Sequence, residues 1–124
     1  MIASMDCVFC KIVAGDIPAH KVYEDEHFLA FLDIRPLAPG HTLVIPKEHH
    51  RWVWDVADMG SYFSVVQKIA KVLQKISGTD EVHMKVVGEE VPHAHVWVFP
   101  APDKATGDKN DFETNAANLR EALG

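Results

Sequence analysis

Two histidines separated by one residue are the most chemically capable feature of this sequence. They lie in the segment VPHAHVWVFP, residues 91–100, whose alternating pattern is typical of a β-strand. On such a strand His93, His95, Trp97 and Phe99 would share one face, and the core-facing side would carry Ala94, Val96 and Val98. Neutral imidazoles act as nucleophiles or bind metal ions, and two of them about 7 Å apart on a strand can serve one site. A strand that merely carries two histidines on its polar face is the alternative interpretation.

The two cysteines of the chain form a second reactive group. Cys7 and Cys10 enclose two residues, a spacing that is typical of a metal site or a redox-active pair. The spacing is too short for an ordinary framework of structural disulfides. Reduced cysteines buried in a core are the third possibility. The local sequence therefore leaves metal binding, redox chemistry and simple packing open.

The chain as a whole has the composition of an ordinary globular protein. Its 124 residues are 48% hydrophobic and 24% charged, which predicts one domain over residues 1–124 with a substantial core. The formal net charge of −6 argues against nucleic-acid binding, because a phosphate backbone is held by a positively charged surface. We expect no membrane span, because the sequence has no apolar run long enough to form one. It also lacks the basic leader of a secretory signal, so a cytoplasmic location is the default expectation.

Hydrophobic periodicity predicts the elements that must position these side chains. Apolar residues at spacings of three and four between residues 59 and 76 indicate a long amphipathic helix, with Asp58 as its N-cap. Strand-like segments cover residues 21–24, 28–33, 41–46, 82–87 and 91–100, and shorter helical segments cover residues 7–13 and 112–123. Strand pairs joined by tight turns, with one long helix, predict an α+β fold around a five-stranded, mainly antiparallel sheet.

Several blocks of the sequence, taken in order, resemble the histidine triad (HIT) superfamily of nucleotide-binding proteins, and its bacterial members in particular. The blocks are CVFCKI at residues 7–12, Ile17-Pro18, YED at 23–25, FLDI at 31–34, GHTLVIPK at 40–47 and the HxH segment. They cover about residues 6–100 and leave 101–124 as a C-terminal extension. The resemblance implies a HIT-like fold, a homodimer, and a purine nucleotide or nucleotide conjugate as the partner. It also implies hydrolysis or nucleotidyl transfer at the α-phosphate of a nucleoside phosphoramidate or dinucleoside polyphosphate.

The same resemblance implies roles for individual residues. His95 matches the family's nucleophile, which attacks phosphorus and forms a covalent nucleotidyl-histidine. His41 matches a separate catalytic histidine that helps to hold the phosphate, and a purely structural histidine at a strand start is the alternative. Asp33, with Ile34 beside it, matches a carboxylate that binds the ribose hydroxyls. The base pocket would be lined by Phe9, Ile12 and Ile17, although apolar residues also serve simply as core.

A structural zinc site is a further implication of the resemblance. In related bacterial proteins two cysteines and two histidines hold zinc, and the matching residues here are Cys7, Cys10, His49 and His93. Two thiolates and two imidazoles suit a closed tetrahedral site, which leaves no position open for activating water. Such a site would hold the N-terminal helix against the segment that carries His95. His50 is the alternative to His49, and a redox-active cysteine pair remains the alternative to the metal.

The chain departs from the family pattern at two places. Trp97 stands where most of the family's hydrolases have a third histidine, and an indole donates a hydrogen bond but cannot accept a proton. We therefore expect slow turnover or a changed leaving-group preference, with Trp97 in the substrate site. The turn before the motif is the short Gly88-Glu89-Glu90, whose carboxylates would repel a phosphate unless they point away. These departures favour an alternative function, a catalytically weak nucleotide-binding or regulatory module that keeps the fold and the zinc.

Overall fold

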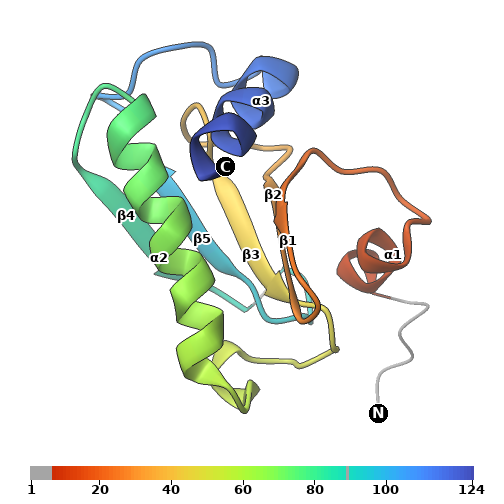
Figure 1. Cartoon of the computed structure of the whole chain (residues 1–124). Helices are drawn as coiled ribbons and strands as arrows, with labels where there is room; N and C mark the ends of the chain where they lie inside the picture. The colour runs from red at the N-terminus through yellow and green to blue at the C-terminus, as the bar shows by residue number, and fades with distance from the viewer. Residues whose placement is uncertain (1–6, 89) are drawn as a thin grey trace.

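An antiparallel sheet of five strands forms the centre of the computed structural model, which describes residues 7–88 and 90–124 (Figure 1). In chain order the elements are α1 (Val8–Ala14), β1 (Lys21–Glu24), β2 (Phe28–Leu32), β3 (Thr42–Pro46), the 3-10 turn η2 (Val53–Asp55), α2 (Met59–Ile76), β4 (Val82–Val86), β5 (Val96–Pro100) and α3 (Phe112–Leu123). Neighbouring strands pair in the order β1-β2-β3-β5-β4. The predicted α+β fold is confirmed, including the C-terminal helix over residues 112–123.

Each helix begins or ends where local chemistry favours it. The Asp58 carboxylate accepts the Ser61 N–H at 3.0 Å, which confirms Asp58 as the N-cap of α2. Asp111 caps α3 in the same way, and the Cys7 sulfur caps α1. Gly15 ends α1 with a φ of 87°, which glycine adopts without strain. Within the described ranges, no helix has the length and apolar character needed to cross a membrane.

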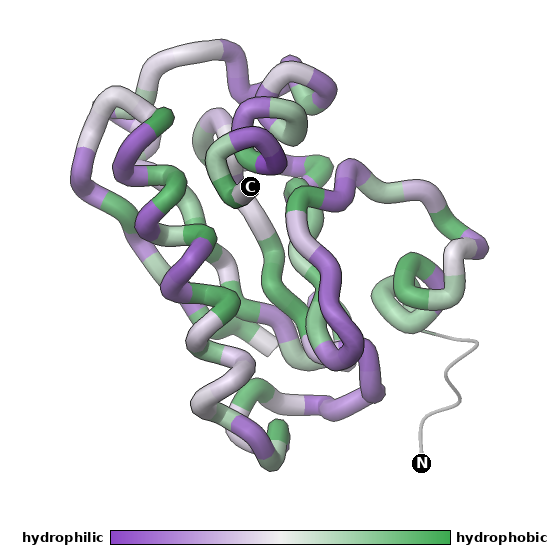
Figure 2. The backbone as a smooth tube through the Cα atoms, in the orientation of Figure 1, coloured by the Kyte–Doolittle hydropathy of each residue, from purple (hydrophilic) through white to green (hydrophobic). Residues whose placement is uncertain are grey.

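The sheet separates two clusters of buried apolar side chains, because alternate residues of the inner strands point to opposite faces. The face covered by α2 and α3 buries the larger cluster, whose strand residues include Ala30, Leu32, Val44, Val96 and Val98. The face covered by α1 buries the smaller cluster, which includes Leu29, Phe31, Leu43 and Ile45. Figure 2 shows α2 alternating between hydrophobic and hydrophilic segments, as expected for an amphipathic helix lying on a sheet.

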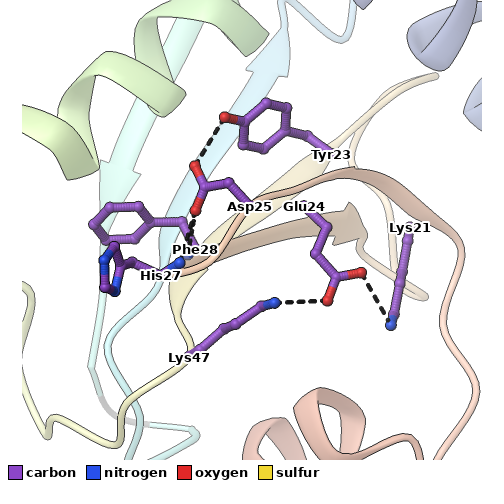
Figure 3. Close-up of polar contacts among 7 residues, drawn as sticks. All are labelled: Lys21, Tyr23, Glu24, Asp25, His27, Phe28 and Lys47. Carbon is purple, nitrogen blue, oxygen red and sulfur yellow. Dashed lines mark hydrogen bonds and ion pairs between the residues drawn. The ribbon is translucent and has the colours of Figure 1, made fainter.

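Polar contacts hold the β1–β2 hairpin and connect it to the end of β3 (Figure 3). Asp25 accepts the Tyr23 hydroxyl and two backbone N–H groups of the turn, each at 2.8 Å. Glu24 pairs with Lys47, which directly follows β3, at 2.8 Å. These contacts stabilise the turn between β1 and β2 and hold β1 near the end of β3, and the end of β2 then leads directly into the loop that carries Asp33.

The fifth strand begins later than the sequence predicts. Residues 91–95 lie outside the sheet, so the prediction of a single strand over residues 91–100 is wrong in its first half. Pro92 has no N–H to donate to a neighbouring strand. The Ala94 N–H donates instead to the carbonyl of His50 at 2.7 Å. Both histidines of the motif therefore lie on an irregular segment that leads into β5, where their rings face different surroundings.

Candidate functional site

A cavity of about 540 Å³ opens on the α1 face of the sheet, a volume typical of small-molecule sites. Its lining includes the predicted nucleophile and all of the predicted substrate-contacting residues, which are Phe9, Ile12, Ile17, Asp33, Ile34, Trp97 and His95. Residues from both halves of the chain thus meet at one cavity. A second cavity of about 360 Å³, between the end of α2 and the start of α3, contains none of them.

His95 is buried at the cavity and its ring is held by two neighbours. Nδ1 lies 2.7 Å from the carbonyl oxygen of His93, and because a carbonyl only accepts, Nδ1 carries the hydrogen. Nε2 is then the nitrogen with the free lone pair. Phe9 of α1 packs edge-on against the ring, with centroids 5.2 Å apart. The backbone therefore selects the tautomer that a nucleophilic imidazole needs at Nε2.

His41 and Asp33 lie together at the end of the cavity near β2. Asp33 Oδ1 accepts the backbone N–H of Arg35 at 2.9 Å, and Oδ2 lies 3.7 Å from His41 Nε2. The His41 ring is 1% exposed and does not line the cavity. Its Nδ1 accepts the Leu37 N–H at 3.0 Å, so the ring hydrogen is on Nε2, toward Asp33. Burial lowers the pKa of His41 against the opposing effect of the Asp33 charge, which keeps the ring neutral at pH 7.

Trp97 forms part of the cavity wall on β5. Its ring centroid is 5.3 Å from that of His41, and the Lys85 ammonium lies over the indole at 5.3 Å from the ring centroid. The indole Nε1 is buried and has no hydrogen-bond partner among the described residues. Glu90 also lines the cavity and is exposed, whereas Glu89 lies outside the described residues. Two of the residues that depart from the family pattern, Trp97 and Glu90, are thus located at the cavity itself.

Two further polar side chains, His20 and Arg35, line the cavity without having been singled out by the sequence. His20 stacks on Phe112 of α3 with centroids 5.3 Å apart, which connects the C-terminal helix to the cavity. The His20 carbonyl accepts the Leu32 N–H at 3.0 Å. No local motif distinguishes His20 from an exposed histidine such as His27. His20 reaches the cavity because the segment before β1 packs against the end of β2, and that contact cannot be predicted from neighbouring residues.

A compact group of four side chains can hold a metal ion, with ligand atoms all within 4.8 Å of one another: Cys7, Cys10, His49 and His93. Cys7 Sγ lies 3.3 Å from His93 Nδ1, and Cys10 Sγ lies 3.2 Å from His49 Nδ1. Tetrahedral zinc, with bonds of about 2.3 Å to sulfur and about 2.0–2.1 Å to nitrogen, places such ligands about 3.5 Å apart. The donor set and its spacing therefore fit zinc. His50, the predicted alternative to His49, is not part of this group of described residues.

Hydrogen bonding and burial prepare His93 as a metal ligand. Its Nε2 lies 2.8 Å from the carbonyl oxygen of Pro46 and must donate, so the unprotonated Nδ1 faces the cysteine sulfurs. Burial lowers the pKa of His93 to about 4, and the ring is neutral at pH 7. Burial, together with a hydrogen bond to Cys7, raises the pKa of the Cys10 thiol to about 11. A cation must therefore displace a proton from sulfur, which strengthens its binding as the pH rises.

Comparison with known proteins places this fold and site in a family. The family model of the HIT domain matches residues 14–104. The chain belongs to the HIT family. Among its relatives, the protein hit of Bacillus subtilis is 42% identical over 122 residues, covering 93% of this chain and 84% of that protein. The adenosine 5'-monophosphoramidase HNT1 of Saccharomyces cerevisiae is 37% identical over 106 residues, covering 82% of this chain and 66% of that protein.

Solved structures of HIT proteins share this fold. A Zn-bound histidine triad family protein from Mycobacterium smegmatis has a TM-score of 0.80 at 37% identity, covering 98% of this chain and 95% of that one. A Hit-like protein from Bartonella henselae has a TM-score of 0.83 at 35% identity, covering 94% of this chain and 96% of that one. The HIT-like fold implied by the sequence is confirmed.

Proposed function

We propose that this HIT protein is a nucleotide hydrolase or nucleotidyl transferase that acts through a covalent nucleotidyl-His95. Its substrate would be a nucleoside phosphoramidate or a dinucleoside polyphosphate, attacked at the α-phosphate. One observation carries the proposal: His95 lines a cavity of nucleotide size while a backbone carbonyl holds its Nδ1 hydrogen. The phosphoramidase activity in the name of the yeast relative supports the reaction class.

The reaction consists of two displacements at phosphorus. The lone pair of His95 Nε2 attacks the α-phosphorus, the Nε2–P bond forms, and the bond to the leaving group breaks with its electron pair going to that group. The carbonyl of His93, which accepts the Nδ1 hydrogen, stabilises the positive charge of the imidazolium. Water or another hydroxyl acceptor then attacks phosphorus and releases its proton to solvent, the Nε2–P bond breaks with its electron pair returning to Nε2, and the neutral imidazole is restored. Two easier steps replace one difficult step.

The remaining lining residues suit the ribose and base of a nucleotide. The Asp33 carboxylate is an acceptor for ribose hydroxyls, and Ile34 beside it is 74% exposed and available to pack against the sugar. His41 supports the site by facing Asp33, because its buried ring does not line the cavity; this differs from the direct phosphate contact that the resemblance implies. The apolar wall offers a surface for a purine base through Phe9, Ile12 and Ile17.

The four-ligand group holds a structural zinc ion in this proposal, as the Zn-bound relative from Mycobacterium smegmatis supports. Cys7 and Cys10 belong to α1 and its cap, His49 follows β3, and His93 precedes β5. Zinc at this place supplies a cross-link between these segments, and a closed set of four ligands leaves no position for substrate. Both cysteines are free, and we infer a cytoplasmic location because a reducing compartment keeps thiols available to the metal.

We also infer that the chain forms a homodimer through β4. This strand is at one edge of the sheet, and its Met84 and Val86 side chains are 50% and 44% exposed. An unpaired edge with apolar side chains favours pairing with a second strand. The double variant Met84→Lys, Val86→Lys is expected to be a monomer by light scattering where the wild type is a dimer. A monomeric wild type would contradict this assignment.

The experiment that tests the enzymatic function compares wild type, His95→Ala and His27→Ala on adenosine phosphoramidate and a diadenosine polyphosphate. His27 is the matched control, because it is an exposed histidine outside the cavity. Wild type and His27→Ala are expected to form a nucleotidyl-enzyme visible by mass spectrometry. His95→Ala is expected to lose turnover by more than about 10³-fold, since nothing replaces the nucleophile. Equal turnover by wild type and His95→Ala rules out the nucleophile assignment.

A nucleotide-binding or regulatory module is the second candidate function. Trp97 and Glu90 on the cavity wall favour it, because an indole N–H is not an acid and a carboxylate repels phosphate. In that case wild type and His95→Ala would bind adenosine monophosphate equally in calorimetry. Neither protein would form a covalent intermediate or turn over substrate.

A further inference from the structure

The side chain at position 97 determines what this site can do for a leaving group. Trp97 lies two residues after His95 and lines the same cavity. Its indole N–H is only a hydrogen-bond donor and does not act as an acid near neutral pH. Nε1 is also buried and has no hydrogen-bond partner in the described part of the chain. No neighbouring group in that part of the chain and no solvent molecule therefore relays a proton to the leaving group by way of this nitrogen.

The neighbouring imidazole of His41 does not donate a proton to the leaving group either. His41 lies beside Trp97, but its ring does not line the cavity. Its Nδ1 is occupied by the Leu37 N–H, and its Nε2 hydrogen faces Asp33. Burial keeps the ring neutral, and the N–H of a neutral imidazole is not an acid near pH 7.

The other charged or titratable side chains around Trp97 are unsuited to this task. Glu90 and Asp33 are carboxylates, which accept hydrogen bonds, and Arg35 does not release its proton in proteins. Lys85 contacts the indole but does not line the cavity. His20 precedes β1, and three strand spacings of about 4.8 Å place its backbone about 14 Å from the line of β5. No described side chain next to the nucleophile therefore provides an acid for the leaving group.

We propose that Trp97 is the specificity-determining residue for the leaving group and restricts efficient reaction to groups that depart from phosphorus as stable oxyanions. This inference rests on the proposed function and selects between its two substrate classes. Phosphoric anhydrides such as dinucleoside polyphosphates are the favoured class, and phosphoramidates are the disfavoured one.

The two classes differ in whether the leaving group needs a proton. When His95 Nε2 attacks an anhydride, the P–O bond breaks and its electron pair goes to a phosphate oxygen, which is stable as an anion. When Nε2 attacks a phosphoramidate, the P–N electron pair goes to nitrogen, which must take up a proton to leave as a neutral amine. General acid catalysis of such a step contributes about 10²- to 10⁴-fold, and this sets the size of the expected discrimination.

The test measures kcat/KM of the zinc-loaded full chain for the 4-nitrophenyl ester of adenosine monophosphate and for adenosine phosphoramidate. The ester-to-phosphoramidate ratio is the readout, in wild type, Trp97→His and Trp97→Phe. Trp97→His supplies an imidazole and is expected to lower the ratio by about 10²-fold. Trp97→Phe is the matched control, because it keeps an aromatic ring and adds no acid, and its ratio is expected to stay close to that of the wild type.

An unchanged ratio in Trp97→His overturns the inference, and so does a selective loss of phosphoramidate turnover in His20→Ala, which would identify His20 as the acid. A second measurement does not depend on how well Trp97→His folds: wild type acting on a series of aryl esters is expected to slow steeply as the leaving oxyanion becomes more basic. A shallow dependence contradicts the inference. Ester turnover through His95 upholds the proposed function in either case, whereas a wild type that forms no nucleotidyl-His95 from the ester refutes both.

Discussion

His93 and His95 belong to one motif but serve two regions, the closed metal-binding group and the open cavity. Each ring donates one hydrogen to a backbone carbonyl: His93 through Nε2 to Pro46 at 2.8 Å, and His95 through Nδ1 to His93 at 2.7 Å. The lone pair is therefore on Nδ1 in His93 and on Nε2 in His95. The carbonyl that each ring meets, and not the residue type, decides which ring nitrogen is free: Nδ1 of His93 for a metal ion, and Nε2 of His95 for the attack that we propose.

The two regions also differ in how far they are closed to solvent and to small molecules. His93 is fully buried among ligands contributed by distant segments, whereas His95 lines an open cavity of about 540 Å³. Phe9 contacts both rings, with centroids 5.9 Å from His93 and 5.2 Å from His95. The four-ligand group thus lies directly beside the backbone that carries His95.

The largest expected effect is a loss of one property in each of two variants: nucleotidylation in His95→Ala and zinc binding in His93→Ala. His95→Ala is expected to keep its zinc and lose covalent nucleotidylation by more than about 10³-fold. His93→Ala is expected to lose the metal, because three ligands remain of four. Elemental analysis of the purified variants and mass spectrometry after incubation with substrate measure the two properties. Loss of zinc from His95→Ala would show that the metal-binding group and the cavity are not independent.

Removal of the metal by a chelator should destabilise the whole fold. When free zinc is present at about a thousand times its dissociation constant, binding contributes about 4 kcal/mol to the free energy of unfolding, and chelation removes it. Cys10→Ser is expected to behave like the chelated protein. His50→Ala is the matched control, because His50 is adjacent to a ligand and outside the group. Urea unfolding midpoints that do not respond to chelation would show that the metal has no structural role.

Tyr62→Phe should affect neither region and so test their independence from the α2 side of the sheet. Tyr62 is 0% exposed, and its hydroxyl donates to the carbonyl of Val44 at 2.8 Å. Deleting this hydroxyl is expected to cost about 1 kcal/mol of stability, because it leaves a buried carbonyl without that donor. Zinc content and nucleotidylation should not change. A change in either would show that the larger core also positions the site.

The smallest effect concerns pH. Burial lowers the pKa of His41 below its ordinary value of 6.5, so the unfolded chain binds a proton at a pH where the folded chain does not. Stability therefore falls as the pH drops below about 6.5, until the folded pKa is reached. His41→Asn removes this group, and its unfolding free energy should depend less on pH at the same zinc concentration. Identical slopes for the two proteins would contradict the assignment of a neutral, buried His41.

The parts of this protein that depend on local chemistry could be predicted from its residues. The periodic apolar residues after Asp58 predict α2 over residues 59–76, and the structure confirms those bounds. Their predictive value comes from helix geometry, because residues three and four apart share a face whatever the rest of the chain does. Ordered motif blocks likewise predicted the HIT-like fold and the four side chains that the structure brings together as a metal-binding group.

The distribution of the polar side chains between the metal-binding group and the cavity depends on long-range packing. Packing starts the predicted strand over residues 91–100 only after the two histidines, keeps His41 out of the cavity and brings His20 into it. It also selected the tautomer of each motif histidine by placing a carbonyl beside one ring nitrogen. These outcomes depend on which backbone groups and distant strands lie nearby after packing, and no spacing along the chain contains that information.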